Sequence, residues 1–257
     1  MNLGLEGRSA LVFGGSRGIG AAAAAALHAE GVRMAYTGRS EASLRATGER
    51  LPGATGLTAD LTREGDAERC VAQAVAALGS IDLAVISAGA AQGGAFETLD
   101  DAVWTDALDL KFLGMVRALR ALIPPMAEAG HGKILVIVGN NGRQPNGMML
   151  PGSAANAACL AVIRGLADVV APKGIRINAL NPGPTRTDRW SGMLERMASA
   201  DPRSPAEIEA DLLKSQPLGR IAEPEDIGRL AAMMLSDATD MLVGTSLTAD
   251  GGATKGL

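Results

Sequence analysis

Aromatic residues and cysteine are scarce in this sequence, and their scarcity excludes several kinds of site. Aromatic residues make up 2% of the chain, and Tyr36 is its single tyrosine. The two cysteines, Cys70 and Cys159, lie far apart and have no metal-ligand spacing. Only His28 and His131 are available as histidine ligands. We therefore expect buried, reduced thiols and no metal site.

Basic runs and long apolar runs are also missing. The formal net charge is −4, whereas proteins that bind nucleic acid or anionic membranes carry a concentrated positive patch. No uninterrupted apolar stretch reaches the length of about 18 residues that marks a membrane-spanning helix, and Glu6 and Arg8 interrupt any signal-peptide core. We expect a cytoplasmic protein that binds a small molecule and neither nucleic acid nor a membrane.

Apolar residues and glycine are abundant, at 47% and 33 residues of 257, which suits one large α/β core. Short β-rich runs alternate along the chain with stretches of helical length. The expected strands are 11–13, 32–37, 55–59, 81–87, 133–138, 175–180 and 246–248. The expected helices are 21–28, 41–51, 64–78, 100–129 with an interruption at Pro124-Pro125, 153–170 and 223–235.

This alternation predicts a doubly wound parallel sheet in a single domain that covers residues 1–257, because the strands are apolar on both faces and helices separate them. Residues 181–205 are rich in Pro, Arg, Asp and Ser and have no clean period. We therefore expect a substrate loop region with short helices at about 181–217.

A glycine-rich turn joins the first strand to an alanine-rich helix. Gly14, Gly18 and Gly20 permit a tight turn and a close approach of the backbone to a pyrophosphate, and the helix N-terminus offers free N–H groups. The turn predicts a dinucleotide phosphate site. A turn that serves packing alone is the alternative.

The second strand is followed by Gly38, Arg39 and Ser40, where an NAD-binding fold would carry an acid about 20 residues past the glycines. Without that acid, Arg39 and Arg17 can pair with a 2′-phosphate, so we expect a preference for NADP(H) over NAD(H). The alternative for Arg39 is a solvated turn residue.

The third strand ends at Asp60-Leu61, where we expect Asp60 to contact adenine. The alternative is a helix cap ahead of Thr62 and Glu64.

The chain resembles a classical short-chain dehydrogenase/reductase over nearly its whole length. The resemblance rests on these motifs: Gly14-Gly15-Ser16-Arg17-Gly18-Ile19-Gly20, Asp60-Leu61, Ala88-Gly89, Arg176-Ile177-Asn178-Ala179-Leu180-Asn181-Pro182-Gly183, Pro217-Leu218-Gly219-Arg220 and Asp250-Gly251-Gly252. It implies a Rossmann-type sheet of seven strands, a nicotinamide cofactor, hydride transfer at a carbonyl or alcohol carbon, and a homo-oligomer, either dimer or tetramer. Small departures are Phe13 before the first glycine and Ile86-Ser87 before Ala88-Gly89.

The expected cofactor-binding residues combine these motif positions with the two arginines. They are Gly14, Ser16, Arg17, Gly18, Ile19, Gly20, Arg39, Ser40, Asp60, Leu61, Ala88, Gly89, Asn156, Pro182, Gly183 and Thr187. By position in the family pattern, Thr187 would face the nicotinamide carboxamide.

The large departure concerns the catalytic groups, for which the family uses Asn, Ser, Tyr and Lys. In this chain Lys111 stands at the Asn position, Gly139 at the Ser position, Gly152 at the Tyr position and Asn156 at the Lys position. Tyr36 lies on the second strand, so the usual tyrosine proton relay cannot operate. The exchange of Asn and Lys predicts an ammonium and an amide in the same small volume.

Lys111 is the first candidate for a replacement acid, since a lysine drawn into a cleft has a lowered pKa. The alternatives are a lysine that extends to solvent or one paired with Asp109. Asn140 and Asn141 follow the fifth strand and either hold a substrate oxygen or only form a turn. Asn156 either binds the cofactor ribose or lies on a helix surface.

Three hypotheses about function remain open. The first is an NADP(H)-dependent oxidoreductase with a non-standard proton donor. The second is a cofactor-binding pseudoenzyme, and the third is a non-redox lyase or isomerase. Gly139 and Gly152 would widen the pocket in either enzyme, and Arg143, Arg186 and Arg189 would suit an anionic or carbonyl-rich substrate unless they are only solvated.

Overall fold

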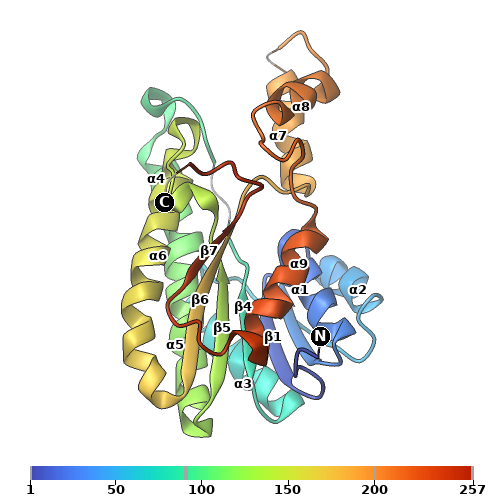
Figure 1. Ribbon diagram of the computed structural model, residues 1–257, viewed down its shortest axis with the longest axis vertical. Helices are drawn as coiled ribbons and strands as arrows, with labels where there is room; N and C mark the ends of the chain where they lie inside the picture. Colours follow the sequence, from blue (N-terminus) through green and yellow to red (C-terminus); the bar gives the residue numbers. More distant parts are fainter. Residues whose placement is uncertain (1, 90–91, 200, 256–257) are drawn as a thin grey trace.

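Seven parallel strands form one sheet in the order β3-β2-β1-β4-β5-β6-β7 (Figure 1). The computed structural model describes residues 2–89, 92–199 and 201–255. The strands are β1 Ser9–Phe13, β2 Arg33–Gly38, β3 Thr55–Thr58, β4 Leu83–Ile86, β5 Gly132–Ile137, β6 Ile175–Pro182 and β7 Ser246–Ala249. The strand order reverses direction between β1 and β4, and ligands of open α/β sheets bind beyond such a point.

Helices cover both faces of the sheet. They are α1 Gly18–Ala29, α2 Glu41–Gly48, α3 Asp66–Leu78, α4 Asp101–Ala107, α5 Gly114–Ala129, α6 Leu150–Val170, α7 Asp188–Ala198, α8 Pro205–Leu213 and α9 Pro224–Leu235. One core lies under α3, α5 and α6, and the other lies under α1, α2 and α9. This is the doubly wound α/β domain that the alternation of strands and helices predicts.

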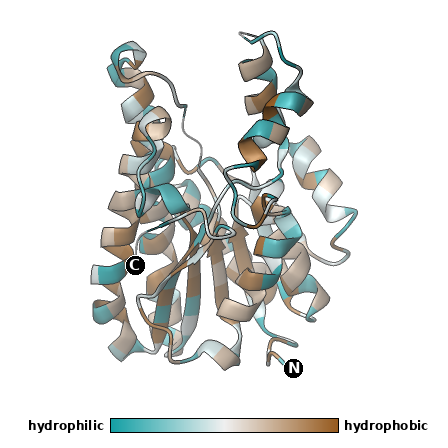
Figure 2. Cartoon of the chain, turned by 45° about the horizontal axis from the view of Figure 1, so that its top comes forward, coloured by the Kyte–Doolittle hydropathy of each residue, from teal (hydrophilic) through white to brown (hydrophobic). Residues whose placement is uncertain are grey.

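Strand β1 contributes to both cores because successive side chains point to opposite faces. Leu11 and Phe13 belong to the core of α3, α5 and α6, whereas Ala10 and Val12 belong to the core of α1 and α9. All four are fully buried, and Figure 2 shows the apolar strands between the helix layers. The continuous apolar run is therefore a consequence of burial on two faces.

The expected interruption at Pro124-Pro125 is wrong. Helix α5 runs through both prolines to Ala129, and the long helical region changes instead at Leu108–Leu113, a π-helical segment labelled η2. The prolines remove two N–H donors close to the end of α5, while Met126 after them is buried in the core. Packing therefore holds this last part of the helix, and the widened turn falls where the chain carries Lys111.

The remaining differences are shifts of element ends. Helix α6 begins at Leu150 instead of residue 153, so Gly152 lies inside its first turn. Helices α7 and α8 occupy the expected substrate loop region and project from one end of the molecule (Figure 1).

Among the described residues, one helical stretch is long and apolar enough to cross a membrane by length and composition alone. This stretch, Gly147–Lys173, contains α6, whose residues Cys159, Ile163 and Ala167 are buried in the core beside β6. A core helix of this kind passes the same test.

Candidate active site

The glycine-rich turn between β1 and α1 leaves no room for side chains at Gly14 and Gly20. Gly14 and Gly18 have φ angles of +73° and +51°, and a Cβ added at Gly20 would collide with the Gly14 carbonyl. The Gly14 N–H donates a hydrogen bond of 3.0 Å to Thr37 Oγ1. Helix α1 begins at Gly18 without an acid in its first turn, so the positive end of its dipole is not neutralised there. These features fit a bound pyrophosphate.

The loop after β2 meets the glycine-rich turn, and each of the two carries an arginine. A Cβ at Gly38 would lie 2.7 Å from Ser16 Cβ, so the end of β2 touches the glycine-rich turn. Arg17 and Arg39 extend from the two loops into solvent, and neither forms an ion pair with a described residue. The Ser40 hydroxyl caps α2 by accepting a 3.3 Å hydrogen bond from Ser43 N–H.

Asp60 closes a turn after β3. Its Oδ1 accepts hydrogen bonds from the N–H and hydroxyl of Thr62, at 3.1 and 2.8 Å. Burial acts to raise the pKa of Asp60, but the Thr62 hydrogen bonds and the Arg39 and Arg63 charges outweigh it and leave that pKa below its usual value. Because α3 is capped at Gly65, the helix-cap alternative for Asp60 is wrong.

The end of β4 packs against the glycine-rich turn. A Cβ at Gly14 would lie 3.1 Å from the Ala88 nitrogen, and Gly89 follows directly. Leu61 is buried nearby in the core, and its carbonyl accepts a 2.8 Å hydrogen bond from Arg117. Thr187 reaches the same region from the N-terminus of α7, since its Cγ2 lies 3.3 Å from the Cβ position of Gly18. Ile19 is half-buried beside these residues in α1.

Lys111 points into the region where β5 ends. Its Nζ donates a hydrogen bond of 2.6 Å to the Val138 carbonyl. Both alternatives for this lysine are wrong, because the ammonium is bound to backbone and Asp109 instead pairs with Arg117 at 2.8 Å. Burial lowers the pKa of Lys111 to about 8, and the Arg189 charge acts in the same direction. A lysine with this pKa exchanges protons near neutrality.

The π-helical segment explains how a helix residue reaches this position. Segments with wide turns are frequent at functional sites, since the extra residue turns a side chain out of the regular helix register. Gly114, which ends the segment, packs with its Cβ position 3.1 Å from Leu61 Cβ. The close approach of this helical region to the loop after β3 is therefore favoured by a residue without a side chain.

Asn156 lies next to Gly139 at the same place. Its Nδ2 is 3.0 Å from the point where a Cβ on Gly139 would be, and Gly139 has a φ angle of +135°. Asn156 is 7% exposed, and its Oδ1 is buried with no hydrogen-bond partner among the described residues. A helix-surface role is therefore wrong, and a buried acceptor without a donor fits a ligand hydroxyl. The structure thus brings Lys111, Gly139 and Asn156 together, and Gly152 is buried in the same helix as Asn156.

Asn140 and Asn141 begin a short 3₁₀ turn, η3 (Asn140–Gly142). The Asn140 amide donates a 3.2 Å hydrogen bond to Asp250 Oδ2. Gly183, after Pro182 at the end of β6, approaches the same residue, with its Cβ position 2.6 Å from Asp250 Cβ. Sequence reasoning missed this role of Asp250, although the motif Asp250-Gly251-Gly252 signals it.

The three arginines expected near the substrate differ from one another. Arg186 pairs with Glu209 and Glu223 at 2.6 and 3.0 Å, so it joins α8 and the start of α9 to the loop. Arg189 donates a 2.9 Å hydrogen bond to the Gly89 carbonyl. Arg143 is exposed after η3. The Arg189 contact is non-local, and no sequence signal predicts it.

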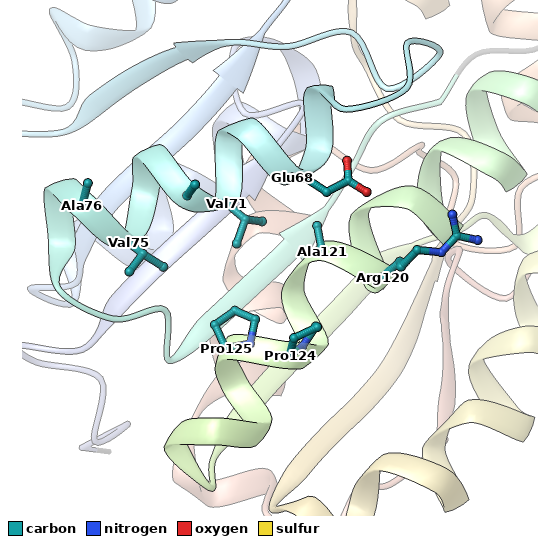
Figure 3. A pocket seen from close by; sticks show the side chains of 9 residues that line it. Glu68, Val71, Val75, Ala76, Arg120, Ala121, Pro124 and Pro125 are labelled. Atoms are coloured by element: carbon teal, nitrogen blue, oxygen red, sulfur yellow. The ribbon is translucent and has the colours of Figure 1, made fainter.

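The structure also contains two buried cysteines and an apolar groove. Cys70 and Cys159 are free and buried, as expected, and burial raises the pKa of the Cys159 thiol to about 11. No group of three or more His, Cys, Asp or Glu able to hold a metal lies in the described part of the chain. An apolar groove between α3 and α5 (Figure 3) lies away from the strand ends that gather the polar residues.

Comparison with known proteins agrees with this architecture. A family profile described as enoyl-(acyl carrier protein) reductase matches residues 14–254. The chain is 30% identical to 3-oxoacyl-[acyl-carrier-protein] reductase FabG of Escherichia coli (strain K12), covering 97% of this chain and 98% of that protein. It is also 30% identical to acetoacetyl-CoA reductase of Rhizobium meliloti (strain 1021), with coverage of 95% and 98%.

Solved structures show the same likeness. An actinorhodin polyketide ketoreductase with NADPH superposes with a TM-score of 0.92 at 28% identity, covering 96% of this chain and 97% of that chain. L-sorbose reductase from Gluconobacter frateurii, complexed with NADPH and L-sorbose, superposes with a TM-score of 0.92 at 25% identity and covers 100% of both chains. With its seven-stranded sheet and glycine-rich turn, the chain belongs to the short-chain dehydrogenase/reductase family of oxidoreductases.

Proposed function

We propose that this protein is an NADP(H)-dependent oxidoreductase that interconverts a carbonyl and an alcohol, with Lys111 as the proton donor and acceptor. The observation that carries the proposal is the Lys111 ammonium, which is bound to the Val138 carbonyl at the end of β5 and lies next to Gly89. No tyrosine lies there, since Tyr36 is buried on β2 and donates to the Leu44 carbonyl.

The residues present fit a phosphorylated nicotinamide nucleotide. The cradle at Gly14 and Gly20 would be filled by any Cβ, which suits close contact with a pyrophosphate. Arg17 and Arg39 supply positive charge where an acid would repel a 2′-phosphate. The buried Oδ1 of Asn156 is an acceptor for a ribose hydroxyl. When bound, the cofactor supplies or takes up the hydride.

The protein's own part is to orient the substrate and move one proton. In reduction, the Lys111 ammonium hydrogen-bonds the carbonyl oxygen and transfers a proton to it as the oxygen becomes a hydroxyl. In oxidation, the neutral amine takes the proton back. The Val138 carbonyl holds Nζ in place through both states. A positioned acid contributes about 10²- to 10⁴-fold to such a reaction. Asn140 donates a hydrogen bond to Asp250 and thereby keeps η3 at the edge of the site.

The test is consumption of NADPH with a panel of ketones, aldehydes and oxo acids. We expect turnover by the native protein and a loss of about 10²-fold or more in Lys111→Met, with cofactor affinity retained. Cys70→Ala, which alters a buried residue in α3 away from the site, is the matched control and should keep activity. NADPH binding without oxidation across the panel would favour a pseudoenzyme. Conversion of a substrate without cofactor would favour a lyase or isomerase.

A further inference from the structure

Two cations from separate elements meet at Gly89, where the chain leaves β4. Arg189 of α7 donates a 2.9 Å hydrogen bond from Nη1 to the Gly89 carbonyl. Lys111 of η2 passes the same residue, with Nζ 3.4 Å from the point where a Cβ on Gly89 would be. The lack of a side chain at Gly89 therefore lets an ammonium and a guanidinium approach one short stretch of backbone.

Neither cation has an anionic partner in the described part of the chain. Lys111 is bound to one carbonyl and Arg189 to another, whereas Arg186, just before α7, is paired with two carboxylates. Burial, assisted by the charge of Arg189, lowers the pKa of Lys111. Two like charges that approach the same residue are unfavourable by themselves, and an anion bound between them relieves that repulsion.

We propose that Arg189 binds the carboxylate of the substrate while the substrate's carbonyl oxygen faces Lys111, so that the substrates are oxo acids. A guanidinium has five N–H donors in a planar fork, and Arg189 uses one of them in its hydrogen bond to the Gly89 carbonyl. The remaining donors match the two oxygens of a carboxylate. The inference rests on the proposed function for the role of Lys111, whereas the anion site is defined by Arg189.

Binding of unreactive acids tests the anion site without turnover. The probes are butyrate, valerate and hexanoate, each compared with its neutral amide by calorimetry, with and without NADP⁺. We expect the native protein to bind at least one acid about 10-fold or more tighter than its amide. Arg189→Gln should abolish this preference, and Arg189→Lys should restore part of it. Arg120→Gln removes the same charge from α5, where Arg120 lines the apolar groove between α3 and α5 (Figure 3), and should leave the preference intact.

Each outcome separates the anion site from the proposed reduction. Equal binding of acids and amides by the native protein overturns the inference, as does a preference that survives in Arg189→Gln. An Arg189-dependent preference for acids without NADPH oxidation by any oxo acid would support the anion site and refute the reductase. Lys111→Met should lose turnover and keep the preference. If Lys111→Met loses the preference while Arg189→Gln keeps it, the carboxylate belongs to Lys111 and our assignment is wrong.

Discussion

Lys111 is a charged side chain that the fold has largely withdrawn from water. The resulting fall of its pKa to about 8 follows from burial, with the Arg189 charge opposing protonation and the Cys159 thiol lying nearby. Because burial raises the pKa of Cys159 to about 11, that thiol stays neutral while Lys111 titrates. The proton that Lys111 exchanges is therefore available in the pH range where enzymes usually work.

The pH dependence of reduction should report this group. With Lys111 as the acid, the protonated fraction is full well below its pKa and falls as pH rises through about 8. We expect kcat/KM for carbonyl reduction to be level at lower pH and to fall about tenfold per pH unit on the alkaline side. In Lys111→Arg any remaining activity should lack this fall, because a guanidinium stays protonated. A native profile without an alkaline fall near this pH would contradict the role of Lys111.

Arg39 determines cofactor preference if the 2′-phosphate lies beside the loop after β2. Replacing it with aspartate puts a carboxylate where the phosphate would bind, so we expect NADPH affinity in Arg39→Asp to fall about 10-fold or more and NADH to become the better ligand. Fluorescence titration measures both affinities. Arg50→Asp, an equal charge change at an exposed position after α2, is the control. Equal affinities for the two nucleotides in the native protein would refute the assignment.

At the scale of elements, Asp82 joins the starts of three neighbouring strands. Its Oδ2 accepts hydrogen bonds from Ser9 N–H and Oγ, at the first residue of β1, at 2.8 and 3.0 Å. Its Oδ1 lies 2.7 Å from Nε2 of His131, which directly precedes β5. The hydrogen bond with Asp82 raises the pKa of His131. Burial acts to raise the pKa of Asp82, but its hydrogen bonds with His131 and Ser9 outweigh burial and lower it.

This pair predicts a pH-dependent contribution to stability. Because the pKa of His131 is raised on folding, its stabilisation is complete below the unfolded value of about 6.5 and is lost as pH rises through the folded value. His131 is partly exposed, so the contribution is at most about 1 kcal/mol. Urea unfolding should show His131→Gln to be less stable than the native protein at mildly acid pH and equal to it at alkaline pH. In an Asp82→Asn background the substitution should have no such pH-dependent effect, and a loss of the same size there would disprove the coupling.

At the scale of the whole molecule, α6 leaves one large apolar side chain exposed on its outer side. One side of the helix is buried against the sheet through Cys159, Ile163 and Ala167, yet Val169 is 60% exposed on another side. An exposed valine is available for contact with a second copy, and the family resemblance implies a homo-oligomer.

We therefore expect the native protein to be a dimer or tetramer and Val169→Glu to lower its mass in solution, because a buried unpaired carboxylate opposes association. Light scattering after size-exclusion chromatography measures the mass. Met241→Glu, at a residue 93% exposed beyond α9, is the matched control and should leave assembly unchanged. A native monomer would exclude this surface as an interface.

Much of the fold follows from local pattern. The apolar runs predict the strands, and the glycine spacing around residues 14–20 predicts the tight turn, because both features depend on backbone conformation and on residues close in sequence. The family motifs extend this to the order of elements. The interruption at Pro124-Pro125 was wrong because packing of the following residues outweighs the local cost of two prolines.

The sequence by itself determined the doubly wound sheet and the tight glycine-rich turn after β1, since both follow from residue type and spacing. Only the tertiary structure decided that Lys111 binds the Val138 carbonyl, that Asn156 carries a buried free acceptor, and that Arg189 reaches Gly89 while Arg186 is held by glutamates. The physical reason is that the charge state and partners of a side chain depend on water exclusion and on groups distant in sequence. Those groups become neighbours only when the chain has folded.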